Sequence, residues 1–97
     1  MWRHGDVLIA ATEAIPPGAK RSQHGVLAYG EITGHSHRVE EPEKAEVWEY
    51  RGERFLKLIA TTRIIHEEHR PITLGPGIYR VWRQREYSPE AIRPLWD

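Results

Sequence analysis

Glycine and proline recur at short intervals along this chain, and the segments between them are rich in Val, Ile, Tyr, Trp and Thr. These residues favour strands, whereas Gly and Pro favour turns. No segment keeps a helical spacing of apolar residues over three turns. Short strands must close a sheet or cover their edges, so the sequence predicts an all-β fold, a small antiparallel β-barrel or sandwich of about six to eight short strands.

We expect one domain spanning residues 1–97, because a second domain would have no core of its own. A C-terminal tail, 88–97, is expected to form a short turn of helix and to dock through Ile92, Leu95 and Trp96. The first predicted strand covers 6–12, and a long second strand covers 25–39 with Gly30 and Gly34 as bulges. Two further strands, 47–50 and 55–60, flank a tight hairpin at 51–54, and residues 61–65 either continue the second of these or form a new strand. The last predicted strands are 72–74 and 78–87.

Histidine is concentrated in two short motifs. Four of the six histidines lie in GHSHRV (34–39) and HEEH (66–69). Alternate residues of a strand point to the same side, so His35 and His37 project together, whereas Ser36 points away and cannot serve as a nucleophile activated by either ring. Two imidazoles on one side of a strand can reach a single metal ion, with ring nitrogens about 2.0–2.1 Å from it.

The HEEH motif supplies the remaining donors of a predicted metal site, and the chain has no cysteine to compete with them. Nitrogen and oxygen donors suit a divalent Zn, Mn, Fe or Ni ion. The predicted metal ligands are His35, His37, His66 and His69, with Glu67 or Glu68 as an auxiliary ligand or catalytic base.

Three protein ligands would leave an open position for water or substrate, so the enzymatic form of this hypothesis is a metal-dependent hydrolase or isomerase. The hypothesis requires the two motifs to meet in space. The sequence equally allows exposed histidines paired with nearby glutamates, or a pH-sensitive interface, and it leaves open whether the protein is an enzyme.

The segments HSHRVEE (35–41) and LGPGIYRV (74–81) resemble a loose version of the cupin pattern. In cupins a strand H-x-H motif, a carboxylate and a later histidine hold a metal inside a small β-barrel. The cupin's final histidine follows a second P-x-G turn, whereas no histidine follows Gly77 here, so His66 or His69 would have to replace it. The two segments 30–39 and 66–89 are also similar to small uncharacterised bacterial and phage proteins of unassigned function.

The alternative hypothesis is a non-catalytic, oligomeric interaction module that binds a protein or single-stranded nucleic acid. Aromatic rings that stack on bases, beside guanidinium groups that meet phosphates, are what a single-stranded nucleic-acid platform needs. The candidate residues are Arg80, Trp82, Arg83 and Arg85 of the last strand. Strand alternation places Arg80 and Trp82 on one face of the sheet, and Arg83 and Arg85 on the other face together with Tyr79 and Val81. This division opposes a continuous platform.

Composition restricts the partners and the setting. The 14 basic and 14 acidic residues cancel, which argues against bulk nucleic acid or an anionic membrane as a dominant partner. The apolar run at 7–11 is too short for a signal peptide or a membrane span, so we expect a cytoplasmic protein. A chain with no Asn, two Gln and 11 Arg against 3 Lys is typical of a heat-adapted or GC-rich source.

Four tryptophans are a high number for a chain of this length. We predict that Trp48 and Trp82 lie in the core, because they fall within predicted strands. Trp2 and Trp96 lie near the termini with no obvious cover in a small monomer. Contact with a second copy would cover them, so the sequence predicts a homo-oligomer.

Overall fold

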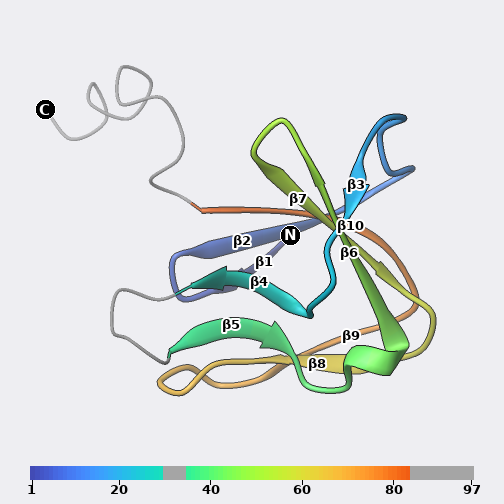
Figure 1. The fold of residues 1–97 in the computed structure, drawn as a ribbon. Helices are drawn as coiled ribbons and strands as arrows, with labels where there is room; N and C mark the ends of the chain where they lie inside the picture. The colour runs from blue at the N-terminus through green and yellow to red at the C-terminus, as the bar shows by residue number, and fades with distance from the viewer. Residues whose placement is uncertain (30–34, 84–97) are drawn as a thin grey trace, which may run out of the picture.

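The computed structural model describes residues 1–29 and 35–83, which form two antiparallel sheets (Figure 1). In spatial order the larger sheet contains β1 (Trp2–His4), β2 (Val7–Thr12), β10 (Gly77–Arg83), β7 (Glu53–Leu58), β6 (Ala45–Tyr50) and β3 (Lys20–Arg21). The smaller sheet contains β4 (Val26–Tyr29), β5 (Ser36–Val39), β8 (Thr62–Ile65) and β9 (Ile72–Leu74). The predicted all-β fold of antiparallel strands is confirmed.

The described residues contain more strands than the pattern of β-branched residues suggested. The additional strands are short and polar, namely β1 with the sequence WRH and β3 with the sequence KR. Backbone pairing to β2 and to β6 makes them strands, and this pairing leaves no hydrophobic signature in the sequence. A single turn of 3₁₀ helix, Pro42–Lys44, precedes β6. Nowhere in residues 1–29 and 35–83 is there a helix long and apolar enough to cross a membrane.

The core lies between the two sheets and takes side chains from both. Along β10 the buried Tyr79 and Val81 point inward, while Arg80 and Trp82 point to the outer face, as the strand alternation predicted. The core cluster comprises Val7, Ile9, Leu27, Ala28, Val39, Val47, Leu56, Leu58, Ile64, Leu74, Tyr79 and Val81. The arrangement is therefore two open sheets that share one hydrophobic interior.

The prediction of one long strand over 25–39 is wrong. Instead, β4 and β5 pair antiparallel with each other, with His37 opposite Ala28 and a bulge between Val26 and Ala28. Doubling back lets the two segments satisfy each other's backbone N–H and C=O groups. Gly30 and Gly34, the expected bulge positions, lie outside the described residues.

The hairpin between β6 and β7 is confirmed, and its turn is shorter than expected. Only Arg51 and Gly52 lie outside the strands, and both have positive φ values, 51° and 79°. Positive φ at both central residues is typical of the type I′ turn that matches the twist of paired strands. After β7 the chain crosses to the other sheet, so residues 62–65 form a new strand, β8.

The prediction that Trp48 and Trp82 belong to the core is wrong, because both are half-buried on the outer face of the larger sheet. The Arg80 guanidinium covers the Trp82 ring at 4.9 Å. Trp2 packs edge-on against Tyr79, with ring centroids 5.6 Å apart, so it already has partial cover within the chain. Homo-oligomerisation stays a prediction. Trp96 and the whole predicted tail, 88–97, lie outside the described residues.

Candidate metal centre

The two histidine motifs meet at one end of the core. His37 is an inward-facing residue of β5 and is 1% exposed. His66 and His69 lie in the connection between β8 and β9, which brings them next to β5 because β8 pairs with β5. His35 immediately precedes β5. Pairing of β5 with β8 is therefore what brings together two motifs that are about thirty residues apart in the sequence.

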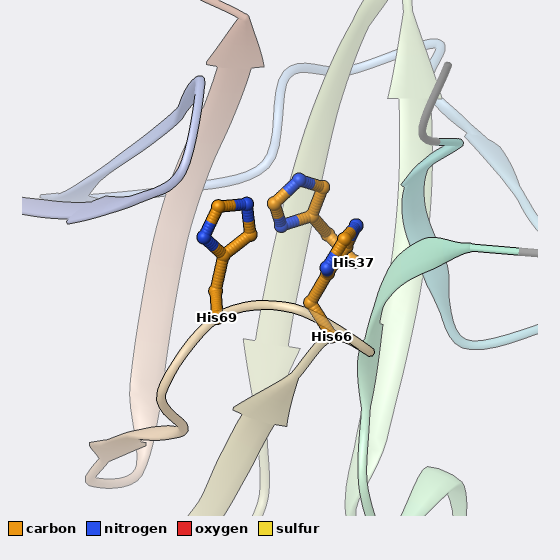
Figure 2. Close-up of side chains that lie close together, drawn as sticks. All are labelled: His37, His66 and His69. Atoms are coloured by element: carbon orange, nitrogen blue, oxygen red, sulfur yellow. The ribbon is translucent and has the colours of Figure 1, made fainter. Parts of the chain in front are cut away.

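Three imidazoles converge closely enough to share one ion. The ring nitrogens of His37, His66 and His69 can be chosen so that all lie within 4.8 Å of one another. Figure 2 shows the three rings turned toward a common point, with His66 and His69 rising from the connection after β8. The ring centroids of His37 and His66 are 4.4 Å apart, and the ring centroids of His66 and His69 are 4.6 Å apart.

His35, His66 and Glu67 form a second group of potential ligands that shares His66 with the first. A neutral His66 has one lone pair and can bind only one ion. The two groups are therefore alternative sites, and His66 can serve only one of them at a time. The His35 Nδ1 atom lies 3.0 Å from Glu68 Oε1. This is an ion-pair distance without the alignment of a hydrogen bond.

Sequence reasoning missed a fifth histidine of the cluster. His4, the last residue of β1, is 2% exposed, and its Nδ1 lies 2.9 Å from Nδ1 of His37. One of these two atoms donates a hydrogen bond to the other. The signal lay in WRHGDV, where Gly5-Asp6 forms a two-residue turn that pairs His4 with Val7. Recognising that turn would have placed His4 on the buried face.

The first turn of the chain is shaped to admit the ring of His69. Gly5 has φ +64°, and a Cβ atom added there would lie 2.5 Å from Nε2 of His69. A side chain at this position would therefore have to displace the imidazole. The absence of a side chain at Gly5 serves both the left-handed backbone and the close approach of His69.

Replacing Gly5 with alanine should lower the free energy of unfolding by about 2 kcal/mol, because it adds left-handed strain and a clash with His69. Urea unfolding of the full chain measures this effect. Gly52→Ala is the matched control, since Gly52 also has positive φ but nothing lies within 4 Å of its added Cβ. If the two variants lose the same stability, the contact between residue 5 and His69 contributes nothing.

The carboxylate of Asp6 determines which nitrogen of His37 carries the proton. Asp6 Oδ1 lies 3.3 Å from Nε2 of His37, and Asp6 Oδ2 lies 4.0 Å from Nε of Arg83. An ionised carboxylate can only accept a hydrogen bond. Asp6 therefore favours the tautomer of His37 that carries the proton on Nε2 and a lone pair on Nδ1. A carboxylate behind a histidine is the usual arrangement that orients a metal ligand.

His66 is held by its own loop. The backbone N–H of Glu68 donates to Nδ1 of His66 over 3.0 Å, which places the proton of the neutral ring on Nε2. His66 must therefore give up this hydrogen bond before it binds an ion, either directly through Nδ1 or, after a change of tautomer, through Nε2. Within the described residues no hydrogen bond restrains the exposed side chain of His69.

Burial keeps His4, His37 and His66 neutral, which is the form that binds metals. Burial is the main reason that the pKa of His37 is lowered to about 4, and the neighbouring His4 and His66 lower it further. Burial also lowers the pKa values of His4 and His66. At neutral pH these three residues therefore present uncharged donors.

Glu67 is poorly suited to the role of catalytic base. It accepts a hydrogen bond of 2.9 Å from the backbone N–H of Ser36 and pairs with Arg38 at 2.7 Å. The Ser36 N–H, followed by the backbone N–H of Glu67 itself and then by Arg38, lowers the pKa of Glu67 to about 2. A carboxylate with such a low pKa is a weak proton acceptor at neutral pH. Glu68 is exposed and stands beside His35.

The residues proposed for nucleic-acid binding do not share one surface. Arg80 pairs with Glu53 at 2.6 Å and covers Trp82 on the outer face. Arg83 points to the inner side, where it approaches Asp6 beside the histidine cluster. Arg85 lies outside the described residues. A surface groove of about 440 Å³ lies elsewhere, where Lys20, Arg21 and Tyr50 are among its lining residues, and no histidine lines it.

The fold and the site together define a small two-sheet β-protein with a buried cluster of histidines at one end of its core. The chain belongs to the family described as "Domain of unknown function (DUF8820)", whose match covers residues 3–84. The matched segment includes all five histidines of the cluster. Comparison with curated proteins and with solved structures gives no match.

Proposed function

We propose that this protein binds a divalent transition metal ion through His37, His66 and His69. The observation that carries the proposal is the convergence of three ring nitrogens within 4.8 Å of one another, from two separate segments of the chain. Ligands of one ion bound at about 2.0–2.1 Å lie within about 4 Å of each other, so only small side-chain movements are required.

The chemistry of the donors supports this function. Burial lowers the pKa values of His37 and His66, so both rings are uncharged at neutral pH, and Asp6 stands behind His37 as an orienting carboxylate. Imidazole donors without thiolate favour Zn, Ni or Cu over Mg or Ca. His35 and Glu67 are additional potential donors, which form a second group with His66.

The hydrolase or isomerase form of the proposal has less support. It needs an open coordination position and a base near neutral pKa, whereas Glu67 is occupied by Ser36 and Arg38. Glu68 would have to serve instead. We therefore propose metal binding, and not catalysis, as the function of this site.

Purified protein, stripped with a chelator and then dialysed against Zn(II), should retain about one ion per chain. Elemental analysis by mass spectrometry measures the ratio, and the same experiment with Ni(II) and Co(II) ranks the metals. His24→Ala is the control, because His24 is exposed and lies outside the cluster. Wild-type protein that retains none of these ions would refute the proposal.

A further inference from the structure

We infer that His4 is a fourth protein ligand, which closes the centre and joins the first strand to the smaller sheet. The inference rests on the proposed metal site and adds a donor from a different part of the chain. His37, His66 and His69 all come from the smaller sheet or its connections, whereas His4 ends β1 at the edge of the larger sheet.

The geometry places His4 at ligand distance from His37, whereas its ring has to move toward His66 and His69, because its nitrogens lie outside the group that converges within 4.8 Å. Its Nδ1 already lies 2.9 Å from Nδ1 of His37, and its ring centroid is 5.7 Å from that of His69. Two nitrogens bound to one tetrahedral ion at about 2.0–2.1 Å lie about 3.4 Å apart. His4 and His37 would have to separate by about half an ångström and rotate so that both lone pairs face the ion.

The hydrogen bonding of His4 is incomplete without an ion. With the His37 proton on Nε2 beside Asp6, the hydrogen bond between the two Nδ1 atoms takes its proton from His4. Nε2 of His4 is then left with a lone pair, and within the described residues this buried atom makes no hydrogen bond of normal geometry. A buried polar atom without a partner costs about 1–3 kcal/mol.

Metal binding through Nδ1 of His4 removes this defect. The ring then carries its proton on Nε2. The backbone of Arg70 raises the pKa of His4, as a carbonyl that accepts a hydrogen bond from the ring does. Nδ1 would hold the ion, and Nε2–H would face the Arg70 carbonyl, which is the ligand and outer-shell arrangement common in metal sites.

A fourth imidazole has a consequence for function. Four protein ligands fill a tetrahedral shell, as in structural sites, whereas three leave a position for water or substrate. The centre would then fasten β1 and the Gly5 turn to the connection between β8 and β9. Such a site suits holding or sensing a metal rather than activating water.

The test is Co(II) and Zn(II) binding by the full chain and by His4→Phe, which retains a ring of similar size without a donor. We expect His4→Phe to bind Co(II) at least tenfold more weakly, and X-ray absorption of the Zn(II) forms to show one imidazole fewer than in wild type. His4→Gln provides a second variant if phenylalanine disturbs packing, and unfolding curves without metal verify that each variant is folded.

The outcomes separate the inference from the proposal beneath it. If wild type and His4→Phe bind Zn(II) with equal affinity and equal imidazole counts, His4 is not a ligand and the three-histidine site stands. A drop in affinity with an unchanged imidazole count also refutes the inference, because His4 would then only position His37. If wild type binds none of these ions, the proposed function itself fails.

Discussion

Replacing His69 with alanine should lower the affinity for Zn(II) about 100-fold. Structural zinc sites in small peptides bind with about 10–16 kcal/mol, so each of four ligands contributes about 3 kcal/mol, which corresponds to about two orders of magnitude. His69 gives the clearest test because it is exposed and no described residue makes a hydrogen bond to its side chain. Its loss therefore removes a donor without leaving a buried polar partner behind.

Competition titration against a chromogenic chelator measures this affinity. His24→Ala should bind Zn(II) as tightly as wild type, because it removes an exposed histidine that takes no part in the cluster. Zinc should also raise the melting temperature of wild type and of His24→Ala, with a much smaller rise in His69→Ala. Equal affinities of wild type and His69→Ala would mean that His69 is not a ligand.

Acidification of the metal-free protein should reduce its stability well before its carboxylates titrate. The pKa of His37 is about 4 in the folded protein, mainly because of burial, against an ordinary value of 6.5. Between pH 6.5 and 4, His37 is therefore protonated in the unfolded chain but stays neutral in the folded protein. Stability is fully present above pH 6.5 and falls through this window, by about 3 kcal/mol from His37 alone.

Urea unfolding in the presence of a chelator, at intervals from pH 7.5 to 2, would show this loss. His4 and His66 act in the same direction, because burial lowers their pKa values too. Glu67 contributes at lower pH, since its pKa is about 2 against an ordinary 4.5, and its stabilisation is lost only as the pH falls through that range. His37→Gln should flatten the upper window and leave the lower one. A wild-type profile that is flat down to pH 5 would contradict the burial of a neutral His37.

Much of the fold could be predicted from local signals. The β-branched and aromatic segments predicted β2, β6, β7, β9 and β10, and the alternation of β10 correctly divided Tyr79 and Val81 from Arg80 and Trp82. The prediction failed at 25–39, where backbone pairing turned one apparent strand into two. It also failed for Trp48 and Trp82, because strand membership does not say which face of the sheet is covered.

In the candidate site, too, some features could be predicted from the local sequence and others depended on the tertiary structure. Residue type and spacing identified the H-x-H and HEEH motifs as groups of imidazoles, the second beside carboxylates, because these properties depend on neighbouring residues only. The tertiary structure decided that β5 pairs with β8 and that the Gly5 turn makes room for His69. It also brought His4 from the other sheet against His37. Contacts between distant segments depend on how the sheets pair and pack, and no local pattern encodes that choice.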